Sequence, residues 1–233
     1  MGEQPFAGNA KFGHYLLERW EQGWLDRYVS KVPPWLETHH LTLLTFLWSG
    51  LIVLCSWLAR RDIRWLWASS AVIVFQYLTD HFDGLVGRYR GTGLVRWGYY
   101  MDHLLDFVFL CALGGGYAWL VPEAWRLAVL LIMGCFASVM VSTFLAFNVT
   151  NQFQLAYFRI GPTEFRIALL IINTLIISSQ GFQQPWEVVL PIILAVSVVA
   201  AAVVVYRTQR RILAMDMAEK SSSNQPTTKD SQP

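Results

Sequence analysis

Long apolar runs without a single charged residue recur along the chain, separated by shorter polar segments. The longest cover residues 41–59, 127–158, 167–186 and 188–206. A bilayer core of about 30 Å is crossed by about 20 apolar residues in a helix, which satisfies its own backbone hydrogen bonds. We therefore predict an all-α integral membrane protein with six transmembrane helices. They lie at residues 41–59, 64–79, 98–121, 123–147, 163–179 and 186–206.

The two ends of the chain differ from this apolar pattern. Aromatic and leucine side chains recur every fourth residue between residues 12 and 28, interspersed with charges, which predicts an amphipathic helix lying in the membrane interface. The chain is thus divided into an N-terminal cytoplasmic segment (1–37), a six-helix transmembrane domain (38–212) and a tail (213–233). The polar end of the tail is rich in Ser and Pro, and the tail is predicted to be disordered.

Composition excludes several classes of protein. Charged residues make up 15% of the chain, against roughly 25% in soluble domains, so an ordinary soluble enzyme is excluded. The net charge of +2 is too small to indicate binding of nucleic acid. The three cysteines all lie in apolar runs, which excludes a disulfide scaffold.

The basic residues indicate an orientation in the membrane. With alternating helices, 14 of the 18 Lys and Arg residues fall on the side of both termini. The other four are Arg60, Arg61, Arg64 and Arg126. By the positive-inside rule both termini are predicted to be cytoplasmic, with the cluster at residues 60–64 as an exception.

Four aspartates lie at membrane depth where the second predicted transmembrane helix leads into the third. If the second helix continues to about residue 90, one of its faces carries Asp80, Asp83, Gly84, Gly87 and Arg88. One face of the third helix carries Gly98, Asp102 and Asp106. Two neighbouring helices joined by a short loop can turn these faces toward each other.

Converging carboxylates need protons or cations, because two unit charges about 5 Å apart repel by about 3 kcal/mol at an effective dielectric constant of 20. Two divalent cations would balance four carboxylates, and ligation by oxygen alone suits Mg²⁺ or Mn²⁺. The glycines would let a bulky ligand approach the backbone, and Arg88 offers a positive fork suited to phosphate. The combination predicts a pyrophosphate site.

The spacing of these residues resembles a family signature. Asp80-x2-Asp83-Gly84-x2-Gly87-Arg88-x9-Gly98-x3-Asp102-x3-Asp106 is similar to the motif of the CDP-alcohol phosphotransferases, which are membrane enzymes of phospholipid synthesis. The chain departs from the motif at two points. Gly87 stands where the family usually has alanine, and the spacing from Arg88 to Gly98 is about one residue longer.

The resemblance implies a homodimeric transferase whose transmembrane domain is catalytic and whose site faces the cytoplasm. Two divalent cations would be held by Asp80, Asp83 and Asp102, with help from Asp106. Gly84, Gly87, Arg88 and Gly98 would bind the nucleotide of a CDP-linked donor. Asp106 would take the proton from an alcohol or lipid acceptor as CMP leaves. The short chain favours a compact protein of a bacterial inner membrane.

The donor and the acceptor stay open. Asp102-His103 followed by Asp106, and the segment Gly161-Pro162-Thr163-Glu164, are similar to motifs of the choline/ethanolamine phosphotransferase branch. That branch transfers a phospho-amino-alcohol to diacylglycerol, and the similarity favours it. The other branch uses CDP-diacylglycerol as the donor and a soluble alcohol as the acceptor.

Four further residues are candidates for the surroundings of the site. His81 and His103 flank aspartates and would orient them, or are ordinary polar residues of the helix surface. Glu164 and Arg166 would contact the acceptor or headgroup, or belong to the N-terminus of the fifth transmembrane helix.

Two other functions are alternatives. Intramembrane aspartates also occur in cation transporters, where they line an ion path. A family member that has lost its activity would survive as an assembly partner, although the complete set of aspartates argues against this.

Overall fold

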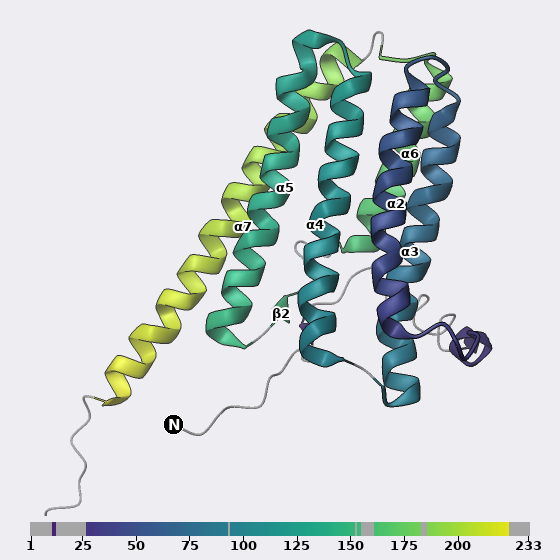
Figure 1. Ribbon diagram of the computed structural model, residues 1–233. Helices are drawn as coiled ribbons and strands as arrows, with labels where there is room; N and C mark the ends of the chain where they lie inside the picture. The colour runs from purple at the N-terminus through teal and green to yellow at the C-terminus, as the bar shows by residue number, and fades with distance from the viewer. Residues whose placement is uncertain are drawn as a thin grey trace, which may run out of the picture.

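The computed structural model of the protein describes residues 11–12, 27–92, 94–151, 153–154, 161–182 and 186–223. It is helical apart from β1 (Lys11–Phe12) and β2 (Phe153–Gln154), which pair in parallel over two residues each. A short 3-10 helix, η1 (Val29–Lys31), precedes the long helices. These are α2 (Thr38–Ala59), α3 (Trp65–Arg90), α4 (Val95–Leu120), α5 (Glu123–Thr150), α6 (Pro162–Ser178) and α7 (Trp186–Ser223) (Figure 1).

Four of the described helices, α2, α4, α5 and α7, are long and apolar enough to cross a membrane. In α3 the charged residues near its end limit the apolar stretch, and α6 has only 17 residues. In α5 and α7 only 11% of the most apolar stretch is buried within the protein, so most of their apolar side chains need lipid or another apolar surface. The all-α fold is confirmed, and the four apolar helices are consistent with an integral membrane protein, whereas the number of six transmembrane helices stays a prediction.

The ends of the helices refine the predicted boundaries. α3 continues to Arg90, as its sequence pattern predicted, and stops at Gly91, whose φ of 66° is left-handed. The predicted start of a disordered tail at residue 213 is wrong, because α7 continues to Ser223 (Figure 1). Residues 207–220 contain no glycine or proline and are rich in helix-forming Arg, Ala and Met. Most of the predicted amphipathic helix, residues 13–26, lies outside the described part.

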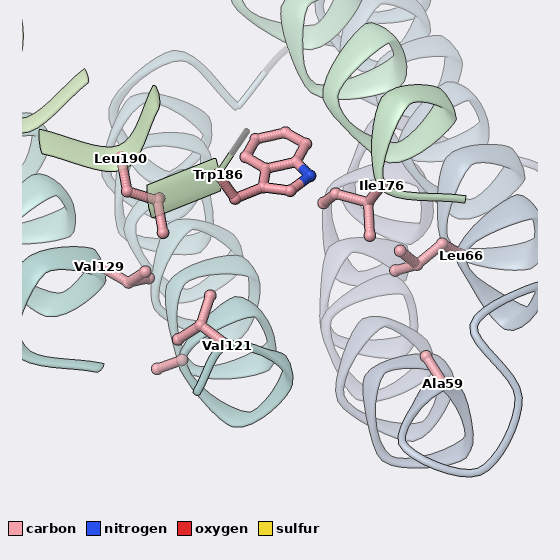
Figure 2. Packing of buried hydrophobic residues seen from close by; sticks show 8 residues of the cluster. Ala59, Leu66, Val121, Val129, Ile176, Trp186 and Leu190 are labelled. Carbon is pink, nitrogen blue, oxygen red and sulfur yellow. The ribbon is translucent and has the colours of Figure 1, made fainter. Parts of the chain in front are cut away.

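One end of the bundle is held by an apolar cluster to which all six helices contribute. Trp186 at the start of α7 lies between Ile176 of α6 on one side and Val129 of α5 with Leu190 of its own helix on the other (Figure 2). The other members of the cluster are Ala59, Leu66, Ala118 and Val121. These residues come from the C-terminal ends of α2, α4 and α6 and the N-terminal ends of α3, α5 and α7. At the opposite end of the bundle, the end of α3 and the start of α4 carry the acidic segment, residues 80–106, with its four aspartates.

Buried polar side chains add ties within the bundle. Asn173 of α6 has no exposed surface, and its Nδ2 donates to the hydroxyl of Ser70 on α3 at 2.9 Å. Its carbonyl oxygen accepts a hydrogen bond from the hydroxyl of Tyr117 on α4 at 2.6 Å. Since such groups find no water in an apolar interior, these bonds favour one arrangement of α3, α4 and α6.

Arg90, the last residue of α3, fixes the segment that leads into α2. Its guanidinium donates to the backbone carbonyls of Val32 at 2.8 Å, Pro33 at 3.0 Å and Leu36 at 2.9 Å, with Pro34 at 3.4 Å. Arg90 thus holds together the ends of two helices. The contact places the start of α2 beside the acidic end of α3.

The close contact between α2 and α4 leads to the first testable prediction. A Cβ atom at Gly116 would collide with Ser56 of α2, including its Cβ, which no side-chain rotation can move away. Gly116→Ala is therefore expected to reduce the free energy of unfolding by about 1–3 kcal/mol through overpacking. The neighbouring Gly115 has no atom within 4 Å of such a Cβ. Gly115→Ala is the matched control, and its thermal midpoint in detergent should stay equal or rise slightly. Equal losses in the two variants would contradict the tight contact.

Candidate functional site

The helical faces of α3 and α4 bring three carboxylates together. Each of Asp80, Asp102 and Asp106 offers an oxygen atom, and the three atoms lie within 4.8 Å of one another. The turn at Gly91 makes this possible, since it ends α3 and lets the chain reverse before α4 begins. All three residues are partly exposed, and the side chain of Asp102 is more open (35%) than that of Asp80 (17%). A set of oxygen ligands with three negative charges fits a hard divalent cation such as Mg²⁺ or Mn²⁺.

Asp83, predicted as a fourth ligand, is not part of this group of three. It is buried, with 8% of its surface exposed, and its Oδ2 accepts a hydrogen bond from the hydroxyl of Thr42 on α2 at 2.8 Å. Along α3 it lies three residues beyond Asp80, so the helix turns the two carboxylates by about 60° from each other. The helical spacing predicted a shared face, but packing against α2 gives Asp83 a different neighbour.

Arg166 of α6 enters the site from the side of α3. Its Nη2 donates to Oδ2 of Asp80 at 2.8 Å, and its Nε donates to Oε1 of Gln76 at 3.1 Å. The guanidinium also lies 5.5 Å from the centre of the Tyr77 ring. Arg166 lies in the first turns of α6 and contacts the acidic group directly, whereas its contact with an acceptor or headgroup stays a prediction. Gln76 was not predicted, although it lies one turn before Asp80 on the same helical face.

The two candidate histidines have the same surroundings on neighbouring helices. Nδ1 of His81 lies 3.1 Å from the carbonyl oxygen of Tyr77, and Nδ1 of His103 lies 2.6 Å from that of Tyr99. Each ring packs on the tyrosine one turn earlier, at 4.4 Å and 4.2 Å. Since a carbonyl oxygen only accepts, this geometry favours a proton on Nδ1 and a lone pair on Nε2. The preceding aspartates lie 4.0 Å and 3.7 Å from the same nitrogens.

The small residues and Arg88 lie along the acidic segment. Arg88 is exposed, and its Nη1 lies 3.3 Å from the position of a Cβ at Gly84, so the arginine folds back over that glycine. Gly87 is buried, whereas a Cβ at Gly98 would meet no atom within 4 Å. The backbone at Gly98 is therefore open to a ligand, and Arg88 has the freedom of an exposed side chain.

Glu164 makes the contact of a helix-capping residue. Its Oε2 accepts a hydrogen bond from the backbone N–H of Gly161 at 2.9 Å. Gly161 is the N-cap residue, directly before the first residue of α6. Thr163, the residue before Glu164 in the first turn, is buried. The cap places Arg166 in the first turns of α6, where it faces α3.

Comparison with known proteins identifies the family of the chain. The profile described as CDP-alcohol phosphatidyltransferase matches residues 38–206, which is most of the chain. The chain belongs to this family. No curated protein and no solved structure shows a significant match to it.

Membership in the CDP-alcohol phosphatidyltransferase family implies phosphotransfer in phospholipid biosynthesis, with CDP-linked substrates and a lipid acceptor. The family is generally dependent on divalent metals. The three carboxylates of this chain fit that requirement, because they supply only oxygen atoms and lie close enough together to share a cation. Neither a cation transporter nor an inactive assembly partner is supported by the family match.

The contact between Thr42 and Asp83 generates the second prediction. Thr42→Val keeps the shape of the side chain but removes the hydroxyl that donates to the buried carboxylate at 2.8 Å. The loss of this donor is expected to lower the free energy of unfolding by about 1–3 kcal/mol. Thr42→Ser, which keeps the hydroxyl, should retain most of the stability. Thermal unfolding of the two variants in detergent is the measurement, and equal stability of wild type and Thr42→Val would show that the bond contributes nothing.

Proposed function

We propose that this member of the family transfers a substituted phosphate group from a CDP-alcohol to an alcohol acceptor, with release of CMP, and requires a divalent metal. The observation that carries the proposal is the meeting of Asp80, Asp102 and Asp106 within 4.8 Å. They come from two helices at the spacing of the family signature. A pyrophosphate cannot approach three carboxylates without cations between them, since like charges at such distances repel strongly.

The carboxylates have separate roles in the proposed reaction. Asp80, Asp102 and Asp106 would hold Mg²⁺ or Mn²⁺, and we propose Asp83 as a further ligand for a pair of cations. When bound, the cations would supply charge stabilisation on the attacking and leaving oxygens. Arg88, Gly84, Gly87 and the open backbone at Gly98 would bind the nucleotide. Asp102, whose side chain is more exposed than that of Asp80, would be the first of the two to meet a donor.

Asp106 is proposed as the general base. It lies one turn farther into α4 than Asp102, on the same face, where the hydroxyl of a membrane-dissolved acceptor could meet it. Its carboxylate would take the hydroxyl proton while the acceptor oxygen forms a bond to the β-phosphorus. The bond between that phosphorus and the oxygen bridging to the α-phosphate breaks, and CMP leaves with the bonding electrons.

We also propose which substrates the protein uses, which residues surround the site and how the protein assembles. The choline/ethanolamine branch is favoured, with a CDP-amino-alcohol as the donor and diacylglycerol as the acceptor, and CDP-diacylglycerol with a soluble alcohol is the alternative. His81 and His103 would orient the carboxylates beside them, which lie 4.0 Å and 3.7 Å from their Nδ1 atoms. Glu164 and Arg166 would adjoin the acceptor. We also propose a homodimer in a bacterial inner membrane, with both termini and the site on the cytoplasmic side.

The third prediction tests the base. Asp106→Asn keeps the size of the side chain but cannot accept the proton, so turnover is expected to fall by roughly 10²–10⁴-fold. Binding of the CDP-alcohol should change much less, because the other acids and the glycine face remain. Asp62→Asn is the matched control, since Asp62 is exposed and pairs with Arg64 at the other end of the bundle. Normal turnover in Asp106→Asn would exclude Asp106 as the base.

The reaction itself is tested with a substrate panel. Purified protein with Mn²⁺ is offered CDP-ethanolamine, CDP-choline and CDP-diacylglycerol separately, each with candidate alcohols, and CMP and the lipid product are measured. We expect metal-dependent release of CMP with one donor, and none after addition of EDTA. Mn²⁺ flux into proteoliposomes without release of CMP would instead support transport. Absence of both activities with every donor would support an inactive assembly partner.

A further inference from the structure

We infer that Arg166 is a positioning residue that acts as an internal counter-ion, stabilising the acidic group and opposing the binding of a cation there. The inference rests on the proposed function, because it takes Asp80, Asp102 and Asp106 as the cation ligands. Arg166 lies on α6, outside the acidic segment. By this inference it joins the residues that determine how tightly the metal is held.

The ion pair is short and poorly accessible to water. Nη2 of Arg166 lies 2.8 Å from Oδ2 of Asp80, and the side chains are 11% and 17% exposed. The charge of Arg166 also attracts Asp106 and Asp102, after Asp80 as the strongest partner. Since little solvent lies between these groups, their interaction is screened less than that of a surface pair.

A second contact keeps the guanidinium in place. Nε of Arg166 donates to Gln76, a residue with no exposed surface, at 3.1 Å. Gln76 lies one turn before Asp80, so the edge of the guanidinium runs along the face of α3 that leads to the acids. Arg166 is therefore held beside the site by a neutral partner, and a change in the charge of Asp80 does not release it.

Arg166 and Gln76 do not use all of their hydrogen-bond donors within the described part of the chain. Nη1 of Arg166 and Nε2 of Gln76 are buried donors without a partner among the described residues. Such donors favour the arrival of an acceptor. An oxygen of a bound substrate could therefore replace the carboxylate as a partner of Arg166 when Asp80 turns toward a cation.

Charge balance gives the direction of the effect. Three carboxylates carry three negative charges, and Arg166 supplies one positive charge against them. Without this charge the acids repel one another and the cation-free protein loses stability. A divalent cation in the same place would no longer be repelled by the arginine and would bind more tightly. Stability without metal and affinity for metal should thus change in opposite directions.

A purely structural role for Arg166 predicts something else. If the arginine only ties α6 to α3, its removal lowers the unfolding temperature equally with and without the cation. The difference between the two conditions therefore separates a counter-ion from a structural tie.

The experiment compares thermal unfolding of wild type and Arg166→Met in detergent, with EDTA and over a titration with MnCl₂. We expect the midpoint of Arg166→Met in EDTA to fall by about 5 °C or more. The rise caused by Mn²⁺ should exceed that of wild type, with an apparent Kd about tenfold lower. Arg166→Lys, which keeps the charge, should behave more like wild type. The control is Arg126→Met, because Arg126 is exposed and pairs only loosely with Glu123 at 3.9 Å.

The outcomes separate this inference from the proposed function. A response to Mn²⁺ that is equal in wild type and Arg166→Met overturns the counter-ion role and leaves the proposed cation site intact. No response in wild type overturns both. If Arg166→Met gives no folded protein, the double variant Asp80→Asn, Arg166→Met is measured in EDTA. We expect it to regain stability because both members of the pair are removed, and failure to regain it contradicts the inference.

Discussion

The structure depends on the meeting of two acidic helix faces at one end of an apolar bundle. Asp80, Asp102 and Asp106 have oxygen atoms within 4.8 Å of one another, in a protein whose helices otherwise present apolar side chains. Such a group needs compensating positive charge, because charge is costly near a bilayer and like charges repel. Arg166 provides part of this charge from within the chain, and a bound cation would provide the rest.

The two ends of the bundle are built differently. At one end an apolar cluster joins all six described helices around Trp186, and buried hydrogen bonds of Asn173 lie nearer the middle. At the other end, polar contacts such as those of Arg90 and Thr42 hold the segments that carry the acids. A firmly packed end fixes the helix positions, so the opposite end can expose charged groups to a substrate.

The sequence predicted the local features of the site well. The 3.6-residue period placed Asp80 on one face of its helix, and Asp102 with Asp106 on one face of the next, and these three do come together. The same period put Asp83 in the group, but Asp83 lies against Thr42 instead. Arg90 binds four carbonyls before α2, a contact that the sequence pattern did not indicate. Both contacts join segments that are distant in sequence.

The sequence alone determined that the protein is helical, apolar enough for a membrane, and marked by the family's spacing of aspartates and glycines, because hydrophobicity and helical periodicity are properties of neighbouring residues. Only the tertiary structure decided that Arg166 and Gln76 adjoin Asp80, and that three carboxylates rather than four share one position. Which side chains meet across helices depends on how whole helices pack, and residues 86 or 90 positions apart carry no local sign of their contact.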